Sequence, residues 1–527
     1  MGDTIDAGTP AAALGGGCES LTPRGATAGS GRLRTRGLAL CVALLAAGCA
    51  TIPIEQQPWI EVRSTSFRVV SQIGPERSAR MARDLELFQS VVKQLTTAER
   101  LEARVPTAIL IFRDAESYLA FGPPDTYGVF VARQRANFAA VNAGVEAIDP
   151  TSVLLHEYVH YVVQNNSPFA YPTWYDEGFA ELMRGTRVTD DQIEVGVVLP
   201  DRMSTLQNNA AMPLEAVLTV QTPLRLGPKR AAVYYAQAWL FVHYLRFGSK
   251  AGFPDRSQQL VRYLELVNTG TPESEACRAA FGVDFATLQA ELVRYFEKGM
   301  FVGQRLPRGD FPEPAQPVVR RLGPGEVAGE LGALALQRGD LVRAEQLFRT
   351  ALASRPGDAR AHFGLAEALR GQEREDEVDE LCKRGLELGP GDALNQLDYA
   401  LNVLAHARVP LTRPERAKLL DEARLHLRRA IELAPNLPEA HAQLGLSYLA
   451  FPGEDRSKAL PPLVNAQRLL GSDVEINYLL ARALLDVGRL VEAQAYVGLA
   501  RARARGRSDL ERIDELEQRI QQARARD

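Results

Sequence analysis

The sequence reads His156-Glu157-Tyr158-Val159-His160 and, a short distance downstream, Trp174-Tyr175-Asp176-Glu177-Gly178-Phe179-Ala180-Glu181. Residues four positions apart lie on the same face of an α-helix, so the first stretch places its two imidazoles side by side. The chain has only seven histidines, and two of them fall in this pattern. The spacing therefore predicts a helix that carries a pair of metal ligands.

A hydrolytic zinc site needs three protein ligands, an open fourth position for water, and a carboxylate that accepts a proton from that water. His156 and His160 supply two nitrogen ligands, and the acidic residues of the second stretch supply a carboxylate. Glu157 lies between the histidines and is the candidate proton acceptor. A single histidine on an apolar helix is usually a core residue, but two at this spacing favour bound Zn²⁺.

Length and composition describe a folded protein with more than one domain. The chain has 527 residues, of which 46% are hydrophobic and 24% charged, and this length exceeds what one ordinary core accommodates. The formal net charge of -4 offers no electrostatic attraction to nucleic acid, so we expect no nucleic-acid partner. Five cysteines are too few for a disulfide framework or a cysteine-based zinc site.

The first 49 residues are expected to be a leader with a targeting signal. Arg32, Arg34 and Arg36 precede a short apolar run that ends at Ala46-Ala47-Gly48-Cys49, which resembles a bacterial lipobox. The resemblance implies lipidation of Cys49, membrane attachment through the lipid, and a place in the bacterial cell envelope. Ala50 after the cysteine implies the outer membrane by the same analogy. An ordinary secretory signal is the alternative.

Residues 50–58 are expected to be a tether, and residues 59–305 a first domain that mixes strands and helices. Strands are expected at 59–72, 108–112, 127–131, 137–141 and 193–199. Helices are expected around the metal motif and at 76–96, 115–121, 231–247, 255–267 and 285–298. Cys277 and Cys382 would remain after cleavage of the leader, and we expect both to be buried free thiols.

A repeat follows a segment at 306–324 that is rich in Pro, Gly and Arg and is expected to be a linker. Pro356 and Pro390 lie 34 residues apart, which is the period of a tetratricopeptide unit. Small and large apolar residues match the consensus around both prolines and in later units. We therefore predict about five units over 325–527, with a polar capping helix near 508–524, and a protein partner for these repeats.

The residues from 59 to about 300 resemble the gluzincin (peptidase MA-like) metallopeptidase domain of bacterial proteins. The matching features are HExxH, the Trp-x-x-Glu-Gly-x-Ala segment at 174–180 and the Tyr-Ala-Gln-x-Trp segment at 235–239. The resemblance implies an α+β zincin-like metallopeptidase domain, followed here by an all-α tetratricopeptide-repeat solenoid. The exopeptidase signature Gly-x-Met-x-Asn is absent, and Ala139-Ala140-Val141-Asn142-Ala143-Gly144 stands in its region. An endopeptidase is therefore favoured, and the strand at 137–141 is a candidate edge for an extended substrate.

The same resemblance implies roles for individual residues. Glu177 is the expected third zinc ligand, and Glu181 is expected to accept a hydrogen bond from a ligand histidine, although the two could exchange these roles. Glu157 would be the general base. Tyr235, on a later helix, is a candidate donor to the oxyanion, and a buried core aromatic is the alternative for this residue.

Two functions remain open from the sequence. One is a membrane-anchored zinc peptidase that cleaves a peptide or protein substrate and whose repeats recruit substrate or partner proteins. The other is an assembly or scaffold lipoprotein that works through its repeats and has an inactive peptidase-like domain. The acidic Glu157 favours the first, since a purely structural zinc site has no need for it.

Overall fold

The computed structural model describes residues 52–95, 107–122, 128–131, 137–144, 150–166, 171–220, 223–269, 271–451, 453–471, 473–504 and 507–526. The expected lipidation site Cys49 and the whole leader 1–49 lie outside these residues. Within the expected tether, Ile54–Gln56 forms a short 3-10 helix, η1. None of the helices in the described ranges is long and apolar enough to cross a membrane.

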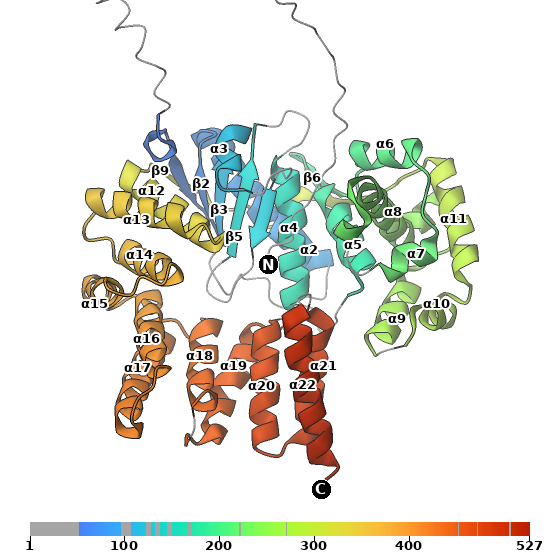
Figure 1. Ribbon diagram of the computed structural model, residues 1–527. Helices are drawn as coiled ribbons and strands as arrows, with labels where there is room; N and C mark the ends of the chain where they lie inside the picture. Colours follow the sequence, from blue (N-terminus) through green and yellow to red (C-terminus); the bar gives the residue numbers. More distant parts are fainter. Residues whose placement is uncertain are drawn as a thin grey trace, which may run out of the picture.

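A mixed sheet of six strands forms the centre of the first part of the chain, in the order β4-β5-β3-β2-β1-β9 (Figure 1). The strands β2, β3 and β5 run parallel, whereas β1 and β4 are antiparallel to their neighbours. Their bounds are β1 Ile60–Arg63, β2 Phe67–Ser71, β3 Thr107–Phe112, β4 Gly128–Val131, β5 Asn137–Asn142 and β9 Val318–Arg321.

The two faces of this sheet pack against different helices, because successive side chains of a strand point to opposite sides. Ile109 and Ile111 of β3 belong to the same buried cluster as α2 (Pro75–Leu95) and α4 (Pro150–Asn166). Leu110, between them, belongs to a second cluster that includes α3 (Ala115–Leu119) and α12 (Pro324–Gln337). The front face of the sheet thus supports the metal-motif helix α4, and the back face is covered in part by the repeat region.

A helical part with a small sheet follows α4. Its α8 is buried along most of its length and packs against α5, which carries the second acidic stretch. The helices are α5 Thr173–Arg184, α6 Pro200–Asn208, α7 Leu214–Thr219, α8 Pro228–Phe247, α9 Ser257–Asn268, α10 Glu273–Phe281 and α11 Phe285–Lys298, with the 3-10 helices η2 Pro223–Leu226, η3 Gly248–Ala251 and η4 Arg308–Asp310. The strands β6 Arg187–Val188, β7 Gln192–Val195 and β8 Gln304–Pro307 form the second sheet.

The C-terminal part consists of helix pairs that stack into an extended array (Figure 1). Small residues permit close packing: a Cβ added at Gly364 would lie 2.3 Å from the Phe348 ring. The helices after α12 are α13 Leu341–Ser354, α14 Ala359–Gly371, α15 Val378–Leu388, α16 Ala393–Ala407, α17 Arg413–Leu433, α18 Pro438–Leu449, α19 Leu460–Leu469, α20 Val474–Asp486, α21 Leu490–Arg503 and α22 Arg507–Arg524, with η5 Arg456–Ala459 before α19. The helices α12–α21 form five successive pairs, and α22 follows them.

The structure confirms several expected elements and adds others. The helices expected at 76–96, 231–247, 255–267 and 285–298 correspond to α2, α8, α9 and α11. The short helices α6, α7 and α10 were not anticipated, because each is too brief to show a clear apolar period. Cys277 and Cys382 are buried free thiols as expected, and burial raises their pKa values to about 11 and about 12.

Two expectations need correction. The strand at 137–141 (β5) is not an edge, because β3 and β4 pair with its two sides; among the described residues β4 is the edge strand next to β5, and β9 is the edge on the opposite side of the sheet. The segment 306–324, expected to be a linker, holds the end of β8 and all of β9, and both strands are paired. Its other Pro and Gly residues lie outside the two strands, and Pro307 ends β8, which lies at the edge of the second sheet.

Candidate metal centre

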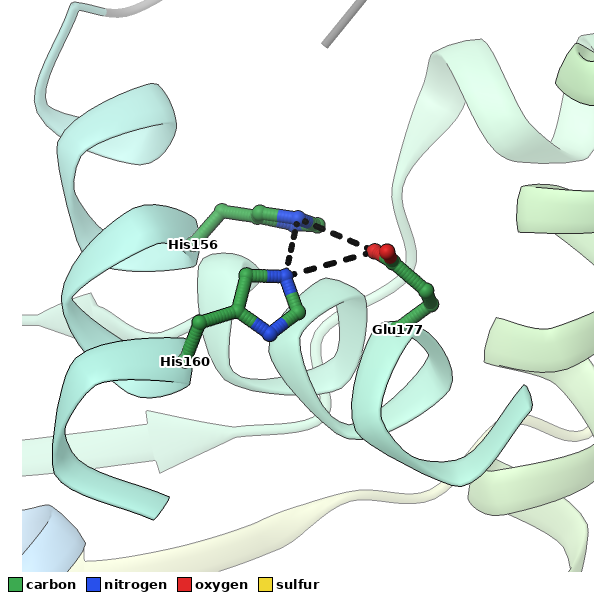
Figure 2. A group of neighbouring side chains, drawn as sticks. All are labelled: His156, His160 and Glu177. Atoms are coloured by element: carbon green, nitrogen blue, oxygen red, sulfur yellow. Dashed lines mark hydrogen bonds and ion pairs between the residues drawn. The ribbon is translucent and has the colours of Figure 1, made fainter. Parts of the chain in front are cut away.

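The helix α4 places His156 and His160 one turn apart, as the sequence spacing predicts. The helix α5 approaches α4 and presents Glu177 to the histidine pair (Figure 2). His156 is fully buried, whereas His160 and Glu177 are partly exposed. The three side chains therefore come from two helices that meet at a partly accessible position.

The three candidate ligand atoms form a nearly equilateral triangle. The His156 and His160 Nε2 atoms are 3.1 Å apart, and Glu177 Oε2 lies 3.5 Å from the first and 3.3 Å from the second. A tetrahedral zinc ion with ligand distances of about 2.0–2.1 Å separates its ligands by about 3.3 Å. The donor atoms thus fit a zinc ion with three protein ligands. Within the described ranges, this is the one group of His, Cys, Asp or Glu side chains close enough to hold a metal ion.

Each histidine has a second carboxylate at its other ring nitrogen. Glu181 Oε1 lies 3.1 Å from Nδ1 of His156, and Asp176 Oδ1 lies 3.2 Å from Nδ1 of His160. A carboxylate at this position accepts the Nδ1 proton, which leaves Nε2 with its lone pair facing the metal position. The structure therefore places Glu181 beside Nδ1 of His156 and adds Asp176 beside Nδ1 of His160, a residue to which the sequence assigned no role.

Arg202 of α6 donates hydrogen bonds to the carboxylate of Glu181. The Arg202 Nε and Nη2 atoms donate to the two Glu181 oxygens at 2.8 and 2.9 Å, and both side chains are buried. Burial by itself opposes ionisation of Glu181, but the charges of Arg184 and Arg202 hold its pKa well below the ordinary value. No sequence motif predicts a role for Arg202, because only the packing of α6 against α8 brings it next to Glu181.

The candidate ligands themselves are strongly coupled. Burial opposes the charged form of Glu177, yet the charge of His160 and the hydrogen bonds of both histidines lower the pKa of Glu177 to about 2. Burial likewise opposes charge on His160, but Asp176 and Glu177 raise the pKa of His160 well above its ordinary value. A metal that binds here must displace a proton shared among these groups.

Glu157 and Tyr235 are buried near this centre. Glu157 follows His156 directly on α4 and is 4% exposed. Tyr235 lies on α8 with the Arg202 guanidinium 5.8 Å from the centre of its ring. The charges of the candidate site also act on the neighbouring Tyr234. Burial and, after it, the charges of Glu177 and Asp176 raise the pKa of the Tyr234 hydroxyl. That hydroxyl has no hydrogen-bond partner among the described residues.

Close packing of α5 on α8 requires glycine at position 178, directly after Glu177. A Cβ added at Gly178 would lie 2.5 Å from the backbone oxygen of Ala238 on α8. Only glycine lets the two helix backbones approach this closely. The Glu-Gly-x-Ala segment therefore sets the position of Glu177 by packing α5 tightly on α8.

Comparisons with known proteins concern the repeat region. Residues 335–401 match the family model of the tetratricopeptide repeat. A thermophilic TPR protein of Thermus thermophilus is 27% identical, with a TM-score of 0.32, over 38% of this chain and 98% of that chain. PilF of Pseudomonas aeruginosa is 19% identical, with a TM-score of 0.31, over 38% and 97% of the two chains. The type IV pilus biogenesis factor PilW is 18% identical, with a TM-score of 0.31, over 38% and 91%.

No curated protein matches the chain. The repeats expected from the proline spacing are confirmed by the family match, and the helix pairs α12–α15 contain most of it. Such repeats suggest protein–protein interaction or a scaffold role. The chain carries a C-terminal tetratricopeptide repeat region.

Proposed function

We propose that this protein is a zinc-dependent peptidase, gluzincin-like in its first part, whose tetratricopeptide repeats recruit substrate or partner proteins. One observation carries the proposal: Nε2 of His156, Nε2 of His160 and Oε2 of Glu177 converge to within 3.1–3.5 Å of one another. Structural zinc sites usually have four protein ligands, whereas catalytic sites have three and an open position. The described residues offer three.

The chemistry follows from the groups around that triangle. Zn²⁺ held there would polarise a substrate carbonyl and lower the pKa of a water molecule toward about 7. Glu157, next to His156, would accept a proton from the attacking water and pass it to the leaving amine. Asp176 and Glu181 would keep the histidines oriented, and Arg202 would keep Glu181 ionised.

The edge strand β4 offers a place for an extended peptide. In the described part of the chain no strand pairs with its outer side. It lies against the metal helix, because a Cβ added at Gly128 of β4 would come within 2.7 Å of the Val153 side chain, one turn before His156. A peptide that adds to β4 by backbone hydrogen bonds would therefore run past the candidate metal centre.

The cellular location is part of the same proposal. A lipid on Cys49 would attach the protein to the bacterial cell envelope, on the outer membrane, with residues 50–58 as the tether. Cys49→Ser should release the protein from the membrane fraction and abolish labelling by a fatty-acid probe. Membrane association that survives this substitution would contradict the anchor.

The decisive experiment measures metal and cleavage together in the full chain. Purified wild-type protein should contain about one zinc per chain and cleave a peptide library in a zinc-dependent manner. Glu157→Gln should keep the zinc and lose cleavage by at least about 10²-fold. Glu116→Gln, an exposed position on α3, is the matched control and should change neither quantity.

The repeat region supports a second candidate function. Its match to the tetratricopeptide family favours an assembly or scaffold role, and in this second proposal the first part would be inactive. In that case wild type and Glu157→Gln would restore a deletion strain equally well, and neither would cleave the library. Restoration by wild type alone would favour the peptidase.

A further inference from the structure

Residues 59–302, which contain the candidate metal centre, are called the metal-site half below, and α12 with α13 is called the first repeat. The segment Gly303–Leu322 connects these two parts, and a strand near each of its ends belongs to a sheet. Near its start, β8 pairs antiparallel with β7, with Leu306 opposite Ile193. Near its end, β9 pairs antiparallel with β1, with Arg320 opposite Glu61. A flexible linker makes few contacts with the domains that it joins. This segment instead pairs with a strand of each sheet, so it does not behave as a flexible linker.

The stretch between the two strands is also anchored. The Arg308 N–H donates to the Asp191 carbonyl at 2.9 Å, and Phe311 is 7% exposed within the core of the metal-site half. After β9, the Leu322 N–H donates to the Trp59 carbonyl at 3.0 Å. Backbone bonds and a buried aromatic therefore hold the segment at intervals along its length.

Charged side chains continue the connection into the first repeat. Glu61 is fully buried on the back of the sheet and accepts hydrogen bonds from Arg68 and Arg320, each at 2.5 Å. Arg68 also donates to both oxygens of Glu330 on α12, at 2.8 and 2.5 Å. One guanidinium thus joins a strand of the central sheet to the first repeat helix.

Apolar packing covers the same interface. Trp59, Leu110 and Phe112 on the back of the sheet share one buried cluster with Val327 and Leu331 of α12. The Arg343 side chain of α13 donates to the Ala120 carbonyl and lies over the Phe121 ring, with its guanidinium carbon 5.4 Å from the ring centre. Without the first repeat, a contiguous apolar surface of the sheet would face water, which is costly.

We propose that Gly303–Leu322 is a strap that fixes the first repeat to the back of the sheet, so that the metal-site half and the first repeat unfold as one cooperative unit. The front of the same sheet supports α4, which carries His156 and His160. A first repeat fixed to the back would hold the later repeats, which continue from it (Figure 1), at a constant position relative to α4. The cooperative unit does not depend on the proposed peptidase function. The constant presentation of a repeat-bound protein to the metal centre does rest on it.

The first experiment cuts the strap in the folded full-length protein. A recognition sequence for a specific protease is inserted between Pro312 and Ala315, in an exposed part of the segment. After cleavage the two fragments should elute together from a sizing column and separate only in denaturant. Separation in native buffer would show that the segment is a simple linker and would overturn the proposal.

The second experiment uses the positions of the tryptophans. All three (Trp59, Trp174 and Trp239) lie before the repeats. Because Trp59 packs against α12, the measurement is made in a Trp59→Phe background, in which the emission comes from Trp174 and Trp239 in the core of the metal-site half. Glu330→Gln in the first repeat should lower the thermal midpoint of this emission by several degrees. An unchanged midpoint would contradict the coupling.

The control for Glu330→Gln is Glu475→Gln. Glu475 on α20 also accepts two hydrogen bonds from an arginine, with Arg512 Nη2 at 3.2 and 2.9 Å from its two oxygens, but it lies at the far end of the repeats. This variant should leave the tryptophan midpoint unchanged while it alters the helical signal of the whole chain. Both tests can be read in metal-free protein, so they are independent of whether the peptidase proposal holds.

Discussion

Arg202 donates two hydrogen bonds, of 2.8 and 2.9 Å, to the carboxylate of Glu181, although the two residues belong to different helices and neither is exposed. Glu181 in turn lies 3.1 Å from Nδ1 of His156. The arginine is therefore linked to the candidate metal centre through two successive contacts, and it supports a candidate ligand, His156, that it does not touch.

Arg202→Gln should weaken zinc binding by about 10–100-fold, which is the usual cost of losing an outer hydrogen-bond partner of a ligand histidine. Glu181 would lose the two hydrogen bonds that fix its carboxylate and one of the two arginine charges that lower its pKa, while Arg184 would remain. Competition with a chelator measures the affinity. Arg187→Gln on the exposed side of β6 is the matched control, and equal affinities in the two variants would show that Arg202 has no such role.

The two candidate carboxylates can be distinguished by the same measurement. Glu177→Gln should abolish stoichiometric zinc, because Glu177 Oε2 faces the Nε2 atoms of both histidines. Glu181→Gln should retain zinc with affinity reduced by about 10–100-fold, because Glu181 faces only the Nδ1 side of His156. The opposite order would mean that the residues have exchanged the roles assigned to them.

Adjacent tyrosines of α8 offer a test of the oxyanion donor. The pattern of the sequence favours Tyr235, whereas the charges of Glu177 and Asp176 act on the hydroxyl of Tyr234. We expect Tyr234→Phe to lower kcat by about 10²–10³-fold with zinc content unchanged, and Tyr235→Phe to lower it less. A larger loss of kcat in Tyr235→Phe would restore the assignment made from the sequence.

Gly178→Ala should destabilise the protein by about 1–3 kcal/mol, because the new Cβ would meet the Ala238 backbone oxygen at 2.5 Å and force α5 away from α8. Zinc affinity should fall as well, since Glu177 moves with α5. Gly329→Ala on α12 is the control: its nearest neighbour is 4.0 Å away, and alanine is the better helix former. Urea unfolding of both variants gives the comparison, and equal stability would contradict the close packing.

His243 predicts a pH dependence of stability away from the metal centre. Its Nε2–H donates to the Gly196 carbonyl at 2.9 Å, and its Nδ1 accepts from the Tyr295 hydroxyl at 2.7 Å, so the buried ring is neutral. Burial lowers the pKa of His243 to about 4 from an ordinary value of 6.5. The unfolded chain therefore binds more protons between these values, and stability falls as the pH drops from 6.5 to 4.

The free energy of unfolding should reach its full value with respect to His243 above pH 6.5, and it should fall by about 3 kcal/mol as the pH drops from 6.5 to 4. Unfolding free energies of wild type and His243→Phe, measured from pH 4 to pH 7, separate this residue from the carboxylates that titrate in both proteins. The variant should show the shallower decline in acid. Parallel curves would mean that the histidine does not titrate as its surroundings indicate.

Much of the fold could be predicted because its signals are local. The spacing of His156 and His160 predicts a helix face, and the structure brings both to the same point with Glu177. The strap could not be predicted in this way. A segment rich in Pro and Gly is typical of a linker, and the strand pairing of β9 depends on β1, which lies some 250 residues earlier in the chain.

The sequence by itself determined the helix that carries the histidine pair, the repeat period and the set of residues that could hold a metal, because each follows from spacing along the chain. Only the tertiary structure decided which carboxylate faces Nε2, that Asp176 and Arg202 join the centre, and that the first repeat closes the back of the sheet. These relationships depend on distances between elements far apart in sequence. Such distances are set by how side chains fill the space between helices and strands, and no local pattern records them.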